Sequence, residues 1–264
     1  MILLRKPWTR QPQIATGINP RFASGIKVVL SGAVNEGRVN LVASPSPPTV
    51  SGTPSQTQTI AGKTIRFQNA TDGLYWPTTT DVSQWSLLID VRFYYDGASN
   101  GFAQWAETTS SSGTPRFNLN NNLGDIRLFW NAGQRFTDVG EAAVGKRATI
   151  VLRYDGTTLY YYRNGIRQTY TSGGTNTGSH IWFGNGYSGS AGQDTSVGAW
   201  WESCLSDTDA MELSIDPWQI FQPITRRLYF DVAAASGRIM SSLTRHGGLA
   251  GSGGIAGHGG GLAS

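Results

Sequence analysis

The chain has 264 residues, among them 34 Gly and 11 Pro, and a net charge of +4. This length allows one large all-β domain or two small ones. The single cysteine, Cys204, excludes an internal disulfide framework, and no apolar run approaches the about 20 residues that a membrane span needs. The N-terminal stretch "MILLRKPWTR" has too few apolar residues before its first charges for a signal peptide, so we expect a protein made in a cytosol.

Positive charge is concentrated at the two ends of the chain. Residues 1–35 carry five Lys or Arg and no acid, and residues 222–264 carry four Arg and one Asp. The middle of the chain is therefore net acidic, and the two basic ends are predicted to dock onto a partner. Nucleic acid is not the expected partner, because the basic residues are spread out and form no Lys/Arg cluster.

The first half of the chain passes from irregular segments to regular strand signals. Residues 1–35 show no clear periodicity and are predicted to form an extended arm. The segment 42–58, "VASPSPPTVSGTPSQTQ", is rich in Pro, Ser and Thr and is predicted to be a loop, either a linker or a surface excursion. Strand-like stretches then follow at short intervals, separated by Gly, Asn and Ser: 64–69, 86–95, 101–107, 116–120, 126–131 and 147–154. This spacing favours a sandwich over alternating strands and helices.

The stretch "RYDGTTLYYYRNGIRQTY", residues 153–170, predicts three antiparallel strands joined by tight turns. It contains Asp155-Gly156 and Asn164-Gly165, and Asn-Gly favours a type I′ hairpin turn because both of its central positions need positive φ. Between the turns, Leu159 and Tyr161 are expected on one face and Tyr160 and Tyr162 on the other. The segment is therefore predicted to be a β-meander.

Two further strands and one short helix complete the predicted elements. The strands are 180–185, "HIWFGN", and 197–204, "VGAWWESC". Ser206 with Asp209 three residues later fits a capping box, and Pro217 ends the helix because it disfavours helical backbone in the residue before it. The predicted fold class is all-β: an antiparallel β-sandwich of the jelly-roll type.

The order of these motifs resembles a known family. A strand ending in Tyr-Asp-Gly, a strand ending in Arg-Asn-Gly and a strand with Phe-Gly precede "LSDTD" and the closing "LSIDPWQIFQP". Together they resemble the laminin-G-like or concanavalin A-like lectin/glucanase domains, and the closing segment resembles a subgroup common in bacteriophages and prophages. The N-terminal "RKPWTRQPQ" and "INPRFASGI" resemble the lead-in of the same phage proteins. The resemblance covers roughly residues 1–232, and the Pro-rich stretch 42–58 departs from the longer apolar strands that phage members often have there.

The carboxylates are tested first for catalysis. Hydrolases of this superfamily carry two glutamates on one strand, as glycoside hydrolysis requires paired carboxylates. This chain has five glutamates, and no two fall on one predicted strand: Glu36, Glu107, Glu141, Glu202 and Glu212. We therefore expect no enzyme activity, with an aspartate pair from separate strands as the alternative.

No cofactor is expected either. Laminin-G-like domains often bind calcium, and four aspartates in predicted loops are the candidates for it: Asp72, Asp96, Asp125 and Asp194. Nothing in the sequence groups them as an EF-hand loop would, so solvated turn aspartates are the favoured interpretation and calcium is the alternative.

Aromatic residues are abundant, with nine Trp, ten Tyr and ten Phe. Sugars are bound by aromatic faces, so Tyr95, Trp105 and Trp130 are the candidates for a glycan platform. The favoured alternative is that these rings fill the core or a subunit contact, where large aromatics bury the most area.

The C-terminal segment 233–264 is predicted to be a Gly-rich assembly tail. It repeats as "GGLAGS", "GGIAGH" and "GGGLAS" with a six-residue period, and glycine at this density orders only against a partner. The residues expected to dock onto other proteins lie in this tail and in the N-terminal arm: Trp8, Phe22, Arg238, Arg245, Leu249, Ile255 and Leu262.

These observations predict an arm at 1–35, a concanavalin A-like sandwich at 36–232 and a tail at 233–264. The predicted function is a non-enzymatic structural protein of a bacteriophage virion, made in the bacterial host cytoplasm. Its terminal arms would anchor it to other phage structural proteins in a homo-oligomer. Capsid decoration or head fibre and tail fibre or tail tip remain open placements. A protein of the tail that recognises a host surface glycan is the alternative, and a polysaccharide hydrolase is disfavoured.

Overall fold

The computed structural model describes fourteen segments of the chain: 17–33, 40–42, 47–59, 62–69, 71–79, 82–93, 102–109, 115–122, 125–130, 133–139, 141, 145–171, 178–184 and 192–221. The chain divides into two units, residues 1–223 and 224–264. All described residues belong to the first unit, so the predicted tail lies outside them. No described helix is long and apolar enough to cross a membrane.

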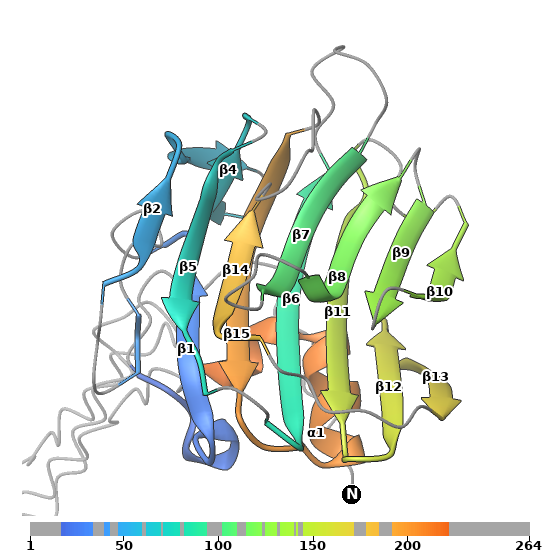
Figure 1. The fold of residues 1–264 in the computed structure, drawn as a ribbon. Helices are drawn as coiled ribbons and strands as arrows, with labels where there is room; N and C mark the ends of the chain where they lie inside the picture. The colour runs from blue at the N-terminus through green and yellow to red at the C-terminus, as the bar shows by residue number, and fades with distance from the viewer. Residues whose placement is uncertain are drawn as a thin grey trace, which may run out of the picture. The chain divides into compact units, whose positions relative to one another are not determined.

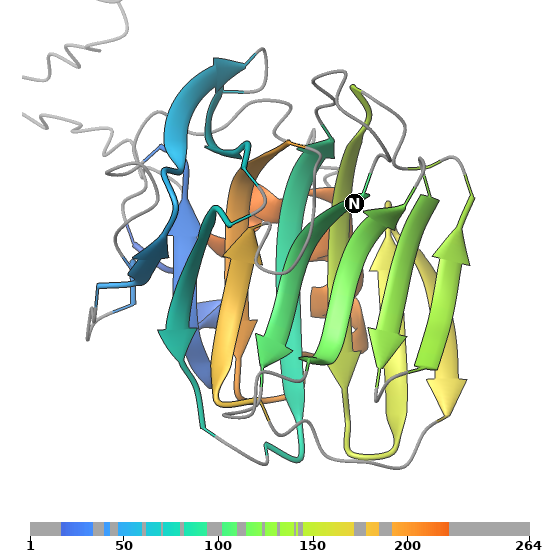
Figure 2. The same cartoon turned by 45° about the horizontal axis from the view of Figure 1, so that its top comes forward.

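Two antiparallel sheets form the described unit, and they face one another as the two layers of a sandwich (Figures 1 and 2). The strands of the seven-stranded sheet are, in spatial order, β10 (Gly133–Asp138), β9 (Asp125–Trp130), β8 (Pro115–Asn122), β7 (Phe102–Thr109), β14 (His180–Gly184), β5 (Gly73–Pro77) and β2 (Thr49–Ser51). The strands of the eight-stranded sheet are β13 (Ile166–Thr171), β12 (Thr158–Arg163), β11 (Arg147–Tyr154), β6 (Trp85–Phe93), β15 (Gln193–Trp201), β4 (Gly62–Phe67) and β3 (Ser55–Thr59), with β1 (Ile26–Ser31) paired to β15. The predicted antiparallel β-sandwich is confirmed.

The main core lies between the two sheets and follows the alternation of the strands. In β6, the alternate residues Leu87, Ile89, Val91 and Phe93 all belong to this core. The intervening residues of β6 are also buried, except Arg92. Strand β6 is therefore covered on both faces.

A second core covers the outer face of the eight-stranded sheet. Helix α1 (Asp207–Ile215) and the short 3₁₀ helices η1 (Pro20–Phe22) and η3 (Pro217–Ile220) pack there against residues such as Leu88, Val151 and Tyr162. In Figure 1, α1 lies behind this sheet, on the side away from the seven-stranded sheet. The predicted helix start is confirmed, because the Ser206 hydroxyl accepts a hydrogen bond from the backbone N–H of Asp209 at 3.1 Å.

The predicted meander is present in full. Strands β11, β12 and β13 pair in sequence, and Asn164 and Gly165 have φ of 51° and 77°, as a type I′ turn requires. Leu159 and Tyr161 lie in the core between the sheets, whereas Tyr162 lies under α1. Tyr160 packs against the same second core as Tyr162, so the predicted faces of Leu159, Tyr160, Tyr161 and Tyr162 are confirmed.

The predicted N-terminal arm is too long. Residues 17–33 are part of the sandwich: Phe22 is buried in the second core, and β1 pairs with β15. The backbone N–H of Asn19 also donates to the carbonyl of Ile220 at 2.8 Å, and Ile18 bridges to Phe221. Strand β1 is apolar on both faces, so it has no alternation that sequence periodicity could detect.

The predicted loop at 42–58 is also wrong in its second half. Residues Thr49–Ser51 form β2 and Ser55–Thr59 form β3, each at one end of the strand order in its sheet. Both strands are short, polar and partly exposed, so backbone pairing to β5 and β4 defines them rather than an apolar pattern.

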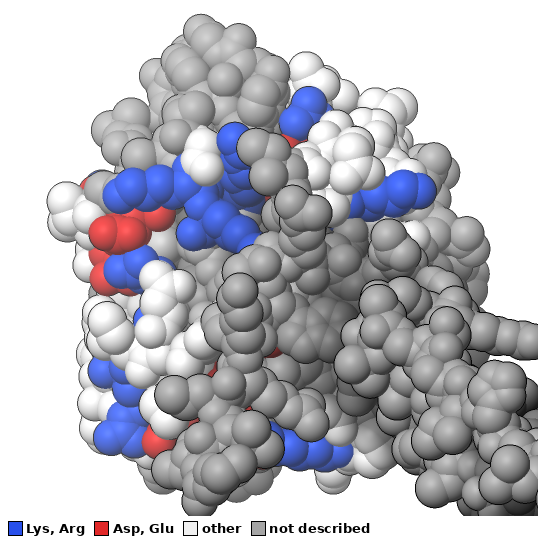
Figure 3. Space-filling model, turned by 180° about the vertical axis from the view of Figure 1, so that it is seen from behind, with Lys and Arg blue, Asp and Glu red and all other residues white. Residues whose placement is uncertain are grey.

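Charged residues cross the part of the eight-stranded sheet that lies away from α1. Arg66, Asp194, Arg92 and Arg147 stand opposite one another on four adjacent strands. Asp194 accepts two hydrogen bonds from Arg66 at 2.7 and 2.9 Å, and Asp90 accepts one from Arg147 at 2.7 Å. Figure 3 shows Lys and Arg gathered on this side of the molecule, with acidic groups beside several of them. Asp194 and Asp90 therefore neutralise Arg66 and Arg147.

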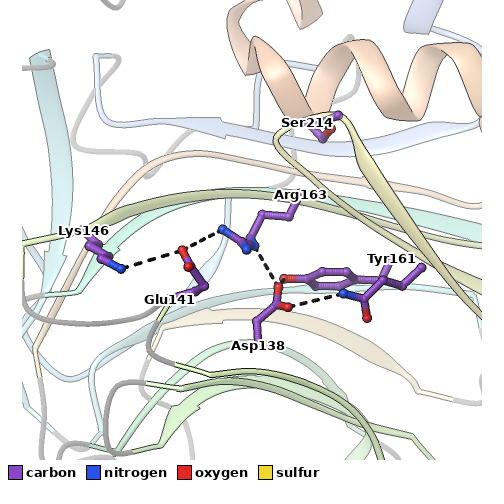
Figure 4. A network of polar contacts seen from close by, with 8 residues as sticks. Asp138, Glu141, Lys146, Tyr161, Arg163 and Ser214 are labelled. Carbon is purple, nitrogen blue, oxygen red and sulfur yellow. Dashed lines mark hydrogen bonds and ion pairs between the residues drawn. The ribbon is translucent and has the colours of Figure 1, made fainter.

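A polar network joins β10 of the seven-stranded sheet to β12 of the eight-stranded sheet (Figure 4). Asp138 of β10 accepts hydrogen bonds from the Tyr161 hydroxyl at 2.7 Å and from Arg163 Nε at 2.8 Å. Arg163 also donates to Glu141, which forms an ion pair with Lys146. Burial and the Asp138 carboxylate raise the pKa of Tyr161 far above its usual range. The network thus holds β10 and β12 together through a neutral, hydrogen-bonded phenol.

Candidate functional site

The predicted glycan platform does not form as a unit. Trp130 is 1% exposed and lies in the core, with its ring centroid 5.2 Å from that of Trp85 and 4.7 Å from that of Tyr154. The alternative assignment to the core is correct for this ring, because residues 126, 128 and 130 of β9 face the other sheet. Tyr95 lies outside the described residues, and of Trp105 the backbone alone is described.

The predicted docking residues are likewise not brought together. Phe22 is 1% exposed, so its ring is not available to a partner protein. Its backbone carbonyl accepts a hydrogen bond from Trp201 Nε1 at 2.7 Å. The remaining docking residues fall outside the described segments: Trp8, Arg238, Arg245, Leu249, Ile255 and Leu262.

A different pair of aromatic rings occupies the outer face of the seven-stranded sheet. Tyr75 of β5 and Trp182 of β14 are directly opposite in register, and both are partly exposed. Their ring centroids are 4.8 Å apart and their planes differ by 6°. The His180 ring meets the Tyr75 ring edge-on, with 5.6 Å between their centroids. His180 Nδ1 lies 2.8 Å from the Ser179 hydroxyl oxygen. We call Tyr75, His180 and Trp182 the aromatic platform.

A glycine seats the Trp182 indole against β5. A Cβ at Gly73 would collide with Cε2 and Cζ2 of Trp182, so the indole occupies the space that a side chain there would need. Gly73 pairs with Gly184 in the register of β5 and β14, and a Cβ at Gly184 would lie 2.9 Å from Cδ1 of Phe67. The absence of a side chain at residue 73 therefore allows the indole to pack on the outer face of the sheet beside Tyr75.

A hollow of about 360 Å³ is lined by residues from the ends of β5 and β15 and from β1. Its lining residues come from both sheets: Lys27, Val28, Asn40, Trp76, Pro77, Thr78, Thr79 and Glu202. Pro77 stands opposite His180 in the ladder, so the hollow and the aromatic platform adjoin along β5. We call this the terminal hollow.

The two charged groups of the terminal hollow are the Glu202 carboxylate and the Lys27 ammonium, and they lie side by side. The carboxylate of Glu202 accepts hydrogen bonds from the Thr79 backbone N–H at 2.7 Å and from the Thr79 hydroxyl at 2.8 Å. Lys27 Nζ lies 3.5 Å from the same carboxylate. Asn40 shapes the wall, since its amide nitrogen donates to the Lys27 carbonyl and its oxygen accepts from the Val29 N–H.

The aspartates that were considered for calcium have structural partners where they are described. Asp72 is fully buried and accepts hydrogen bonds from the backbone N–H groups of Thr53, Gln68 and Asn69. Asp194 is paired with Arg66, and Asp125 lies 3.6 Å from an Arg127 nitrogen. Among the described segments, no group of three His, Cys, Asp or Glu residues is arranged to hold a metal ion. Asp96 lies outside them.

No family model matches the chain, and no curated protein matches it. Among solved structures it is similar to the botulinum neurotoxin serotype D ligand-binding domain in complex with N-acetylneuraminic acid, with a TM-score of 0.59 and 11% identity over 73% of this chain and 51% of that chain. The receptor-binding domain of the C/D mosaic serotype matches with a TM-score of 0.57, 11% identity and the same coverage. The type G receptor-binding domain matches with a TM-score of 0.55 and 12% identity, over 72% of this chain and 51% of that chain.

These matches span about half the length of each toxin domain, and at this identity they show a shared fold. The chain therefore has the β-sandwich architecture found in receptor-binding domains of botulinum neurotoxins. A shared fold does not determine function, so the site must be argued from this chain's own residues.

Sequence reasoning missed the aromatic platform, although a signal for it exists. In "GLYWP", residues 73–77, Leu74 and Trp76 point inward and Tyr75 outward; in "HIWFG", residues 180–184, His180 and Trp182 point outward between inward Ile181 and Phe183. An aromatic residue at an outward position of a strand is the feature to look for. The pairing of the two strands, more than 100 residues apart in sequence, is visible in the structure alone.

Proposed function

We propose that the protein is a non-enzymatic carbohydrate-binding protein of a bacteriophage virion. The observation that carries the binding role is the aromatic platform, in which Tyr75 and Trp182 form a partly exposed stack on an outer sheet face. Tyr and Trp combine a large apolar face with a polar group, which suits a ligand that carries both C–H faces and hydroxyls. A sugar ring is such a ligand.

The solved structures support a binding role over a catalytic one. The matched toxin domains are named as receptor-binding or ligand-binding domains, and one of them was solved with a bound sugar acid. Glycoside hydrolysis would need two facing carboxyl groups about 5–9.5 Å apart at the ligand site. At the terminal hollow, the described carboxylate is Glu202, and it is engaged by Thr79 and Lys27.

The virion assignment rests on the resemblance of the lead-in and closing segments to phage proteins. In the fold, the described parts of these segments, 18–26 and 213–221, form one packed unit with α1: Arg21 contacts Asp209 and Glu212 of α1, and Phe22 packs in the same core as Trp218. This unit closes the sandwich, so anchoring to other virion proteins is assigned to residues 1–16 and 233–264. Capsid decoration or head fibre and tail fibre or tail tip are the two placements, and self-association into a homo-oligomer belongs to the same proposal.

The binding role is tested with Trp182→Ala on a glycan array and on host cells. We expect loss of glycan binding with little change in unfolding midpoint, because Trp182 is partly exposed. Phe129→Ala is the matched control: Phe129 is also a partly exposed aromatic on the outward side of its strand, but on β9, three strands from β14. Equal binding by the two variants, or no binding by the wild-type protein, would contradict the carbohydrate role.

The anchoring role is tested by truncation after residue 232. All described contacts of the sandwich lie within residues 17–221, so the shortened chain is expected to keep the unfolding midpoint of the full chain. Incorporation into particles is expected to be lost, since the Gly-rich tail gains order only against a partner. A truncated protein that is still incorporated would contradict the role of the tail.

A further inference from the structure

The terminal hollow offers a second kind of ligand contact, distinct from ring stacking. Lys27 occupies a β-bulge: Ile26 pairs with Trp201 and Val28 with Trp200, so one residue of β1 has no partner in β15. A bulge redirects the side chain of the extra residue. Here the Lys27 ammonium lies 3.5 Å from Glu202, the residue that directly follows β15.

Glu202 and Thr79 connect the two sheets at this point. Glu202 follows a strand of the eight-stranded sheet, and its N–H donates to the Gly25 carbonyl at 2.8 Å. Thr79 follows a strand of the seven-stranded sheet and donates to both carboxylate oxygens. The Glu202 side chain is 11% exposed, so its position is fixed and a small part of it faces the hollow.

The charges of the hollow specify a ligand chemistry. Glu202 is an acceptor with unused lone pairs, and the Lys27 ammonium, 53% exposed, has donors left over. Adjacent hydroxyl groups of a sugar can each donate and accept, so one hydroxyl can donate to Glu202 while its neighbour accepts from Lys27. A phosphate or a free carboxylate would face the Glu202 carboxylate, which disfavours a purely anionic ligand.

We propose that the terminal hollow binds one sugar residue through a vicinal diol, with Glu202 as the acceptor and Lys27 as the donor. The ligand class rests on the proposed carbohydrate-binding function, whereas the residues are separate from the aromatic platform. The volume of about 360 Å³ is at the lower end of the range of small-molecule sites, which suits a single sugar ring. Because Pro77 stands opposite His180, one saccharide can contact the platform and the hollow together.

The test uses the full chain with defined probes: trans-1,2-cyclohexanediol, methyl α-mannopyranoside and methyl β-galactopyranoside, with cyclohexanol as the probe that lacks a diol. The readout is the amide NMR signal of Thr79, whose N–H donates to Glu202. Lys27→Met removes the donor and keeps the stem, and the exposure of Lys27 makes a folding defect unexpected. Lys63→Met, at an exposed lysine of β4 outside the hollow, is the matched control.

We expect at least one diol-bearing probe to shift the Thr79 signal in the wild-type protein and in Lys63→Met. In Lys27→Met the same probe is expected to bind with about tenfold lower affinity. Cyclohexanol is expected to leave the signal unchanged. No shift with any diol at millimolar concentration, or an equal response of Lys27→Met, overturns the proposal. The two proposals fail separately. Glycan binding that is lost in Trp182→Ala but unchanged in Lys27→Met refutes the hollow alone. A diol-induced shift of Thr79, together with unchanged binding of Trp182→Ala on the glycan array, refutes the platform alone.

Discussion

Replacement of Trp130 by alanine tests whether the tryptophans of this chain serve the core or the surface. The ring is 1% exposed and packs against Trp85 and Tyr154 at centroid distances of 5.2 and 4.7 Å. A buried aromatic side chain covers about 150–250 Å², which at about 25 cal/mol per Å² corresponds to about 4–6 kcal/mol as an upper value. Measured Trp→Ala losses in cores are about 3–5 kcal/mol, so we expect a loss of that size.

The assay is urea unfolding followed by far-UV circular dichroism. With a slope of about 1–3 kcal/mol per molar urea, this loss lowers the midpoint by at least about 1 M. The total free energy of unfolding of an ordinary domain is about 5–15 kcal/mol, so the loss in Trp130→Ala is a large fraction of it. Trp130→Phe is therefore measured as well, because it keeps an aromatic ring in the site and is expected to lose less.

The result that would refute the reasoning is specific. If Trp130→Ala lowered the midpoint no more than Trp182→Ala does, the inward orientation of β9 would be wrong. The register of β9 on β8 would then be in error by one residue, because a one-residue slip moves every side chain of a strand to the other face.

Three further predictions address the polar contacts and the turns. Tyr161→Phe removes the hydrogen bond to Asp138 and is expected to cost about 1.5–3 kcal/mol in urea unfolding, and a loss below about 0.5 kcal/mol would argue against the buried contact. Burial alone would raise the pKa of Asp155, but hydrogen bonds from Thr158, Thr157 and Tyr160 outweigh it and lower the pKa to about 2. The contribution of the Asp155 carboxylate to stability is thus present above its unfolded pKa of about 3.9 and disappears as pH falls through about 2. The difference in unfolding free energy between wild type and Asp155→Ala is expected to be about 1 kcal/mol or less, because the site is partly exposed. This difference should close between about pH 4 and pH 2 and stay constant above that interval. Gly165→Ala places a Cβ at φ of 77° and is expected to cost about 1–2 kcal/mol in thermal unfolding, whereas an unchanged melting temperature would contradict the type I′ turn.

The elements that sequence reasoning found share one property: each is defined by local pattern. Alternation marks β6, turn dipeptides mark the boundaries of β12, and a capping serine marks the start of α1. The missed strands lack such patterns. Strand β1 is buried on both faces because Val28 and Leu30 lie in the core between the sheets while Ile26 and Val29 lie in the second core. Strand β3 is a polar strand defined by its pairing with β4. Both are set by tertiary context, which overrides local propensity.

The candidate site was less predictable than the fold for a related reason. Trp130 and Trp182 are both tryptophans in short aromatic strands, and composition does not separate them. Their roles differ because residue 130 faces the opposite sheet and residue 182 faces outward. The terminal hollow depends on a bulge at Lys27 and on a contact between Glu202 and Thr79, which are 123 residues apart. Neither leaves a signal in local sequence.

The outer faces of the two layers of the sandwich differ in what covers them. The described parts of the segments that resemble phage proteins, 18–26 and 213–221, meet on the outer face of the eight-stranded sheet, where Asn19 binds the Ile220 backbone and Phe22 packs with Trp218. Their sequence is therefore constrained by packing in the second core. The aromatic platform lies on the opposite layer and uses residues that the core does not need. Substitutions on that face leave the segments that close the sandwich unchanged, so the proposed carbohydrate ligand must be tested at Tyr75, Trp182 and the adjoining hollow.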